Sequence, residues 1–454
     1  MGSTVVVRTL VLGAGVTGRS VARVLESRGD VVAMLDENRS GSDFISPDQI
    51  DSQSWDRAIV SPGWRSDHPI VRRVSDLGIS LVSEIDLAWG IRNEIAPNQR
   101  WIAVTGTNGK TSTVELTTAI LKEAGLHATA CGNVGDTVIE AVVSSEKWDF
   151  LVVELSSFQL YWSELPEFSA SAILNIADDH VDWHGTFDDY TAAKIKILER
   201  CDVALLNADD PTVVGATQHC SGKKVFFSLD TPSPGELGLV ENLLIDRAFV
   251  PDQQEASVIA ELLDVHPSAP HSVSNALAAA GLARALGVPH EVIQRGIKNF
   301  RPGRHRIEMI ANVAGVSWID DSKATNPHAA AASLASQLSV IWIAGGLAKG
   351  ASMQSLVART KGRLKAALLI GTDRDLIANE LRNQAPNVPI YFVDEDSSAS
   401  HSLMENVVLR AKDIAAAGDA VMLAPACASM DQFVDYSDRG DQFSAAVQKL
   451  VVGA

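Results

Sequence analysis

The sequence has few cysteines, a shortage of positive charge and no long apolar run, and each shortage excludes a class of protein. Its four cysteines are scattered among 454 residues without a CxxC pair, which argues against a disulfide framework or a zinc site and favours a reduced, cytoplasmic chain. With a net charge of −18, the chain lacks the basic field that nucleic-acid or membrane-surface binding requires. No apolar run is long enough to span a membrane. Arg8 interrupts the apolar N-terminal stretch, so no signal peptide is expected.

What the sequence does contain is an alternation of apolar strands with helical segments along its whole length. A chain of 454 residues exceeds one ordinary core, so roughly two to four domains are expected. The alternation predicts an α/β fold with mainly parallel sheets, in which ligands bind beyond the carboxyl ends of strands. We expect three domains: a Rossmann-like domain at 1–93, a central P-loop domain at 94–300 and a second Rossmann-like domain at 301–454. The polar stretch 92–100 is the expected first linker.

A phosphate-binding loop is the clearest motif of the central block. Residues 104–113 read VTGTNGKTST, which departs from G-x-x-x-x-G-K-[ST] in having Val104 at the first glycine. Backbone N–H groups of such a loop bind phosphates, its lysine contacts the outer phosphates, and its hydroxyl ligates Mg²⁺. The preceding strand and following helix disfavour the alternative, an ordinary strand-to-helix turn. The predicted nucleotide-binding residues are Gly106, Thr107, Asn108, Gly109, Lys110, Thr111 and Ser112.

Acidic and histidine side chains follow two later strands of this block and are candidate Mg²⁺ ligands. Glu154 ends an apolar strand, where a carboxylate needs a partner, although it could instead cap the helix that follows Ser156. The segment 178–185, DDHVDWHG, contains His180, and a histidine can complete a carboxylate site. The alternative is a solvated turn that caps the next helix, with Asp188 or Asp189 as the cap.

The N-terminal block carries a second glycine-rich motif. Gly13, Gly15 and Gly18 follow one strand and Asp36 ends the next, which taken alone is a dinucleotide-binding fingerprint. It leaves open a nicotinamide-dependent oxidoreductase, although that reading does not explain Lys110. An ATP-driven binding switch that catalyses no further reaction is a second alternative.

Together these motifs resemble the Mur ligase family of peptidoglycan synthesis. The resemblance rests on TGTNGKTS, on ELSSFQL, and on H-x-D-W-H-G followed by Y-x-x-A-K. In the third block, DSKATNP at 321–327 and APACASMDQF at 424–433 are similar to the member that adds D-glutamate. The resemblance implies an ATP-dependent amide-bond ligase that adds D-glutamate to UDP-N-acetylmuramoyl-L-alanine through an acyl phosphate. Addition of a different amino acid is the alternative within the family.

The resemblance also implies roles for individual residues in a monomeric, cytoplasmic enzyme with ATP and two Mg²⁺ ions. Lys194 would act as a carbamate formed with CO₂, although both Lys194 and Lys196 could instead lie on a solvated helix face. Tyr436 stands where the family commonly has phenylalanine. The implied catalytic residues are Lys110, Glu154, His180 and Lys194, and the implied metal ligands are Thr111, Glu154, His180 and Lys194. Asn275, Arg306 and Asp321 would complete the ATP site. The implied substrate-binding residues are Val16, Thr17, Asp36, Ser61, Gly63, Asn133, Ser156, Gln159, Lys323, Thr325, Lys349, Ser429 and Tyr436.

Overall fold

The computed structural model describes residues 6–38, 41–50, 55–220, 222–252, 254–394 and 401–453. The chain forms two compact units, Met1–Ser268 with Ser272–Phe300 and Ala269–His271 with Arg301–Ala454. The first unit holds a four-stranded and a nine-stranded sheet, and the second holds a six-stranded sheet. The predicted α/β class with mainly parallel sheets is confirmed. No helix among the described residues is long and apolar enough to cross a bilayer. The boundaries 1–93, 94–300 and 301–454 stay predictions.

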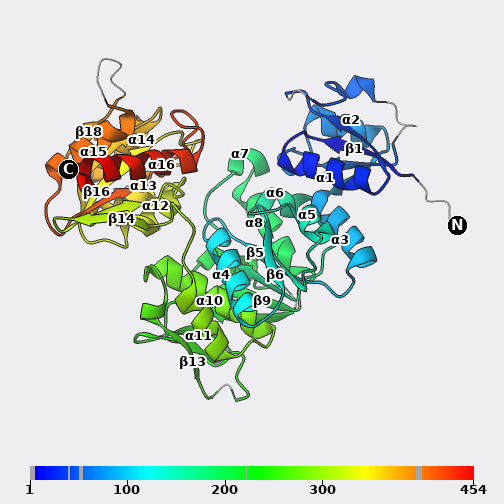
Figure 1. The fold of residues 1–454 in the computed structure, drawn as a ribbon, viewed down its shortest axis with the longest axis horizontal. Helices are drawn as coiled ribbons and strands as arrows, with labels where there is room; N and C mark the ends of the chain where they lie inside the picture. The colour runs from blue at the N-terminus through cyan, green and yellow to red at the C-terminus, as the bar shows by residue number, and fades with distance from the viewer. Residues whose placement is uncertain are drawn as a thin grey trace. The chain divides into compact units, whose positions relative to one another are not determined.

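The four-stranded sheet is entirely parallel, in the order β2-β1-β3-β4. Its helices α1 and α2 pack on opposite faces (Figure 1). The strands are β1 (Arg8–Leu12), β2 (Val31–Leu35), β3 (Arg57–Val60) and β4 (Ser80–Ser83), and the helices are α1 (Val16–Ser27), α2 (Pro69–Asp76) and α3 (Glu84–Ile95).

The linker predicted at 92–100 is wrong in its first half. Helix α3 continues to Ile95, and β5 already begins at Arg100. The Arg92 guanidinium donates from Nε to the carbonyl oxygen of Gln99 at 2.8 Å, which ties the last helical turn to the connection. The polar residues Arg92, Asn93 and Glu94 therefore belong to the end of a helix rather than to a loop.

The nine-stranded sheet has the order β13-β12-β11-β10-β9-β8-β5-β7-β6 and becomes antiparallel only at its β11–β13 edge, among the strands that the structure describes. Its strands are β5 (Arg100–Thr105), β6 (Ala128–Gly132), β7 (Phe150–Glu154), β8 (Ala170–Ile173), β9 (Val203–Asn207), β10 (Lys223–Phe227), β11 (Leu237–Val240), β12 (Leu243–Asp246) and β13 (Ser257–Glu261). Its helices are α4 (Lys110–Glu123), α5 (Val138–Val143), α6 (Ser157–Trp162), α7 (Val181–His184), α8 (Phe187–Ile195), α9 (Pro211–Ala216), α10 (Pro270–Ala285) and α11 (His290–Asn299).

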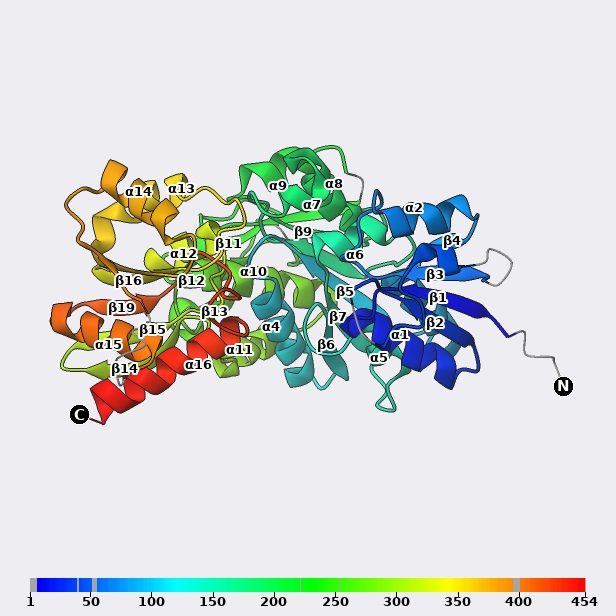
Figure 2. The same cartoon turned by 90° about the horizontal axis from the view of Figure 1, so that it is seen from above.

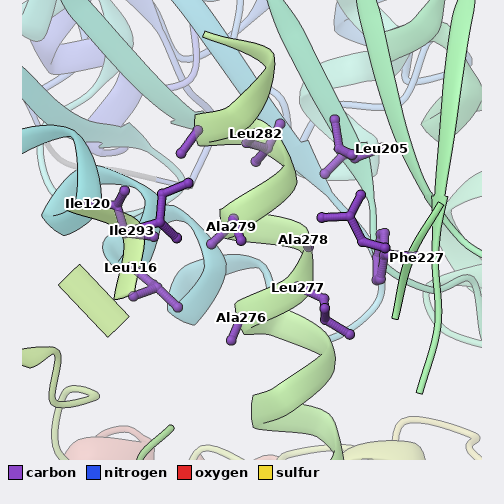
Figure 3. Packing of buried hydrophobic residues seen from close by; sticks show 14 of the residues in the cluster. Leu116, Ile120, Leu205, Phe227, Ala276, Leu277, Ala278, Ala279, Leu282 and Ile293 are labelled. Atoms are coloured by element: carbon purple, nitrogen blue, oxygen red, sulfur yellow. The ribbon is translucent and has the colours of Figure 1, made fainter. Parts of the chain in front are cut away.

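Helix α10 is the centre of the core on one face of this sheet. Its apolar residues lie between Leu116 and Ile120 of α4 on one side and Leu205 and Phe227 of the sheet on the other (Figure 3). Burial of this apolar surface fixes α10 against α4. The N-terminal half of α10 is thereby held beside the start of α4, where the predicted phosphate loop ends.

The six-stranded sheet has the order β14-β15-β19-β16-β17-β18, with α13 and α14 on one face and α15 and α16 on the other (Figure 2). Strands β15 to β19 of this block coincide with apolar runs in the sequence. Strand β14 pairs antiparallel at the edge, and its partly exposed residues form no clear apolar run. The strands are β14 (Glu308–Val313), β15 (Val316–Asp320), β16 (Val340–Gly345), β17 (Leu364–Ile370), β18 (Ile390–Phe392) and β19 (Ala420–Leu423). The helices are α12 (Pro327–Leu334), α13 (Gln354–Thr360), α14 (Arg374–Gln384), α15 (Leu403–Ile414) and α16 (Tyr436–Val447).

Candidate active site

The predicted phosphate loop joins β5 to α4 at the carboxyl end of the central sheet. Gly109 is the N-cap of α4 with a left-handed φ of 85°. A glycine has no side chain to cap the helix, so the N–H groups of the first turn can face a phosphate. A β-carbon added at Gly109 would lie 2.5 Å from Oδ1 of Asn275, so this turn and α10 approach each other closely. The structure thus brings Asn275 beside the loop, and its implied role at the ATP site stays a prediction.

Asn175, which follows β8, fixes the conformation of the loop and was missed from the sequence. Its Oδ1 accepts from the backbone N–H of Asn108 at 2.8 Å, and its Nδ2 donates to the Asn108 carbonyl at 3.0 Å. Its own carbonyl accepts from the N–H of Thr107 at 2.9 Å. The position of Asn175 just beyond a parallel strand is the signal that could have identified it.

Two lysines converge on the loop from different helices. Lys110 donates from Nζ to the carbonyls of Gly106 and Thr107 at 2.9 and 3.0 Å. Lys194 is 2% exposed, donates to the same Gly106 carbonyl at 2.9 Å, and lies 4.6 Å above the Tyr190 ring. Burial, with Lys110 nearby, lowers the pKa of Lys194 well below its ordinary value. The alternative that Lys194 lies on a solvated helix face is therefore wrong.

Glu154 ends β7 as a buried carboxylate with one oxygen unsatisfied. Its Oε1 accepts from Nδ2 of Asn133 at 2.9 Å, whereas its Oε2 is buried without a hydrogen-bond partner. The helix-cap alternative is wrong, because the hydroxyl of Ser156 caps α6 by accepting from the N–H of Gln159 at 3.2 Å. A buried carboxylate oxygen without a donor needs a cation, so this residue fits the Mg²⁺ that the motifs imply.

His180 is the N-cap of α7 and has a left-handed φ of 53°. Its Nε2 lies 3.6 Å from Oδ2 of Asp179, and its ring centroid lies 4.7 Å from that of Phe158. Burial lowers the pKa of His180, the charges of Lys110 and Lys194 act in the same direction, and the carboxylates of Asp179 and Asp182 oppose them without reversing the shift. The neutral imidazole that results is the form that binds a metal ion.

The helix that follows this segment is not capped as expected. The hydroxyl of Thr186 accepts from the N–H of Asp189 at 3.1 Å and caps α8. The prediction that Asp188 or Asp189 supplies the cap is therefore wrong. Threonine is among the preferred caps, and here it stands immediately before the first helical residue.

The glycine-rich turn of the N-terminal sheet meets two neighbouring strand ends. The buried carboxylate of Asp36 accepts from the N–H of Ala14 at 2.8 Å. A β-carbon at Gly13 would lie 2.8 Å from Oγ of Ser61. The turn also begins α1, where Val16 is 78% exposed and Thr17 is half-buried. Val16, Thr17, Asp36, Ser61 and Gly63 therefore all lie at the carboxyl edge of one sheet.

In the second unit, the candidate amino-acid residues follow β15, β16 and β19. Lys323 Nζ lies 3.9 Å above the Tyr436 ring. Burial raises the pKa of the Tyr436 phenol, but Lys323, a hydrogen bond with Ser437 and the charge of Arg306 together outweigh burial, so that pKa falls below its ordinary value. Lys349 is exposed in a left-handed turn with φ 49°, and Ser429 is buried. Thr325 is half-buried two residues beyond Lys323.

A buried arginine, which sequence reasoning missed, ties these loops together. Arg439 is fully buried and donates to the Ser322 hydroxyl at 2.9 Å, the Ser322 carbonyl at 3.0 Å and the Cys427 carbonyl at 3.2 Å. Leu347 and Ala428 also pair directly across the loops after β16 and β19. The loops that carry Lys323, Lys349 and Ser429 are therefore one connected structure.

Arg306 and Asp321 lie in the same unit. Arg306 stands between two residues with left-handed backbones, His305 at φ 64° and Ile307 at φ 50°. Asp321 accepts from the N–H of Ile307 at 3.3 Å and from the Ser333 hydroxyl. Burial raises the pKa of Asp321 to about 7. Their predicted role at the ATP site stays a prediction.

A grouping of potential metal ligands also occurs at His305, Glu308 and Asp320. Its members already bond to one another: His305 Nδ1 lies 2.7 Å from Oδ2 of Asp320, and Glu308 accepts from the His305 N–H at 2.9 Å. This arrangement is explained as a hydrogen-bonded cluster that holds the segment before β14.

Comparisons with known proteins agree with this geometry. The family described as "Mur ligase middle domain" matches residues 104–283, and that described as "Mur ligase, glutamate ligase domain" matches residues 305–427. A UDP-N-acetylmuramoylalanine–D-glutamate ligase of Streptomyces avermitilis is 44% identical over 461 residues, covering 97% of each chain. A ligase of the same name from Thermobifida fusca is 44% identical over 464 residues, covering 98% of each chain.

Two solved structures show the same three-domain fold at low sequence identity. A pseudomurein peptide ligase type C from Methanothermus fervidus has a TM-score of 0.62 at 16% identity, covering 98% of this chain and 99% of that chain. The MurF ligase of Thermotoga maritima in complex with ADP has a TM-score of 0.60 at 15% identity, covering 99% and 97%.

Proposed function

The chain belongs to the Mur ligase family of ATP-dependent, ADP-forming ligases, and on that premise we propose that it adds D-glutamate to UDP-N-acetylmuramoyl-L-alanine. The near full-length relatives named for that reaction support the substrates. The observation that carries the proposal is that one chain contains both a phosphate loop, in the first unit, and the connected Lys323, Lys349 and Ser429 loops, in the second. The product would be a precursor of peptidoglycan.

The reaction needs activation of a carboxylate, which is a poor acylating agent. The γ-phosphoryl group of ATP passes to the alanyl carboxylate, giving ADP and an acyl phosphate. The amine of D-glutamate then attacks the acyl carbon, and the tetrahedral intermediate releases phosphate as the amide forms. Lys110 would stabilise the charge on the transferred phosphoryl group, and Asn133 would contact the reacting end of the substrate. Ser156 and Gln159, which follow Glu154 along the chain, are also proposed to bind the substrate.

Thr111, Glu154, His180 and Lys194 are proposed to hold two Mg²⁺ ions. When bound, Mg²⁺ would neutralise phosphate charge during transfer. The orphaned Oε2 of Glu154 supports this assignment. We also propose that Lys194 becomes a carbamate: its neutral amine attacks CO₂, a N–C bond forms, and a proton leaves to solvent. The lowered pKa of Lys194 supplies the neutral amine.

The three sheets would then divide the substrates among the domains 1–93, 94–300 and 301–454. Asp36, Ser61 and the α1 turn would bind the UDP part of the substrate. Gly106 to Ser112, with Asn275, Arg306 and Asp321, would bind ATP. Lys323 and Lys349 would supply cations for the two carboxylates of D-glutamate, with Thr325, Ser429 and Tyr436 alongside. We propose a cytoplasmic monomer that binds neither nucleic acid nor membranes stably.

The decisive experiment measures phosphate release from ATP with UDP-N-acetylmuramoyl-L-alanine and each candidate amino acid. Release that depends on D-glutamate, and not on L-glutamate or meso-diaminopimelate, is the expected result. Release that depends on another amino acid would support ATP-dependent ligation but show that D-glutamate is not the amino acid added. Release independent of any amino acid would favour a binding switch. A chain that releases no phosphate but binds NADH would favour the oxidoreductase alternative.

A further inference from the structure

The turn that follows β3 is hydrogen-bonded to the short helix that begins at His180. The indole Nε1 of Trp183 donates to the carbonyl of Gly63 at 3.0 Å. In the other direction, Nη1 of Arg65 donates to the carbonyl of Asp182 at 2.6 Å. Helix α7 has only four residues, so a displacement of Asp182 or Trp183 must also displace its N-cap, His180.

The same turn is bonded separately to α6. The indole Nε1 of Trp162 donates to the carbonyl of Trp64 at 3.0 Å, and the Tyr161 hydroxyl donates to Oγ of Ser66 at 2.7 Å. These bonds hold the turn but do not involve the helix that carries His180. Loss of the Trp162 bond therefore serves as a control for loss of the Trp183 bond. Both remove an indole N–H donor to the turn, but of the two only the Trp183 bond joins α7 to it.

Helix α7 packs on α6 through aromatic contacts. The ring centroid of Trp183 lies 4.7 Å from that of Phe158 and 5.2 Å from that of Tyr161. His184 Nε2 lies 2.9 Å from the Ser157 hydroxyl. These contacts hold the side of α7 that packs on α6. The two bonds from Trp183 and Arg65 hold α7 against the turn that follows β3. The left-handed backbone of His180 makes that position specific, because such a conformation persists only where its surroundings enforce it.

We propose that Trp183 and Arg65 are positioning residues that couple occupancy of the UDP-substrate turn to the placement of His180 beside the Mg²⁺-nucleotide. This inference rests on the proposed function, which assigns Ser61 and Gly63 to the UDP-substrate and His180 to Mg²⁺. A substrate that orders the turn fixes α7 through the two bonds. Coupling of equilibria is reciprocal, so the Mg²⁺-nucleotide strengthens binding of the UDP-substrate by the same factor.

The test measures the Kd of UDP-N-acetylmuramoyl-L-alanine by calorimetry, with and without Mg²⁺ and a non-hydrolysable ATP analogue. The proteins are the wild type, Trp183→Phe, Arg65→Met and the control Trp162→Phe. In the wild type, the Mg²⁺-nucleotide should tighten binding by about 5-fold or more. Trp183→Phe keeps an aromatic ring against Phe158 and removes the N–H, so the tightening should fall below about 2-fold. Arg65→Met should reduce the tightening to the same extent. In Trp162→Phe, the Mg²⁺-nucleotide should tighten binding of the UDP-substrate as much as in the wild type.

Each outcome decides the inference. Wild-type coupling in both Trp183→Phe and Arg65→Met overturns it. An equal loss in Trp162→Phe also overturns it, because general loosening of the turn would then suffice. A wild type that binds the substrate without any coupling removes the inference and leaves the proposed function intact. A wild type that does not bind this substrate removes both. Thermal unfolding of each variant identifies a folding defect, and the second variant keeps the test decisive if one fails to fold.

Discussion

Lys110 and Lys194 donate hydrogen bonds to one acceptor, the carbonyl oxygen of Gly106, at 2.9 Å each. Two ammonium groups on one carbonyl repel each other, and the more buried group loses its proton more easily. Lys194 is that group, at 2% exposure. On the proposed function, Lys110 would face phosphate, and Lys194, whose pKa burial lowers, would supply the neutral amine that a carbamate requires.

Replacement of Lys194 by alanine tests the carbamate. Removing an anionic metal ligand should lower kcat by at least about 100-fold, and acetate or another short carboxylate should restore part of the activity by occupying the vacated space. The measurement is phosphate release over a series of acetate concentrations. Lys196→Ala is the matched control, because Lys196 donates instead to the Tyr161 carbonyl. Full activity of Lys194→Ala would refute the carbamate.

Replacement of Lys110 by alanine tests the phosphate loop. Loss of the cation that stabilises the transferred phosphoryl group should lower kcat by about 100-fold or more. Binding of the UDP-substrate should change less than about twofold, since Lys110 is not among the residues proposed to bind it. The measurements are steady-state turnover and calorimetry. Lys122→Ala, in the last turn of the same helix, controls for loss of one positive charge. Retained turnover would remove the loop assignment.

The strand–loop–helix setting of the predicted phosphate loop could be read from the sequence because the motif is local. Gly109, Lys110 and Thr111 occupy consecutive positions, with a strand before the loop and a helix that begins at Lys110. Arg439 could not be read in that way, because it contacts loops that only the folded sheet brings near. Asn175 offered only its position just beyond a strand, and its contacts with Thr107 and Asn108 likewise need the folded sheet. The sequence likewise placed Glu154 at a strand end but could not show that one of its oxygens lacks a donor.

Replacement of Asp36 by alanine tests the assignment of the N-terminal sheet. The carboxylate accepts from the N–H of Ala14 at 2.8 Å and from that of Asn38 at 3.0 Å, so its loss should release the glycine-rich turn. The KM for the UDP-substrate should rise by about 10-fold, the effect of one charged hydrogen bond, and the KM for ATP should not change. Asp43→Ala removes a comparable bond, to the Met34 N–H, without touching the turn. A defect confined to ATP would reverse the domain assignment.

Replacement of Glu84 by glutamine should change how stability depends on pH. Glu84 is buried at the start of α3, where its carboxylate accepts from the N–H of Ile139 at 2.7 Å, and burial raises its pKa from 4.5 to about 7. The unfolded chain therefore releases this proton at lower pH than the folded chain, so the stability that protonated Glu84 provides is lost as pH rises from 4.5 to about 7. Relative to Glu84→Gln, the wild type should lose about 2 kcal/mol of unfolding free energy between about pH 5.5 and 7.5. Urea unfolding at several pH values measures this difference. Glu94→Gln, at the exposed end of the same helix, controls for the loss of one charge. A difference between wild type and Glu84→Gln that stays constant with pH would show that Glu84 is already ionised in the folded protein.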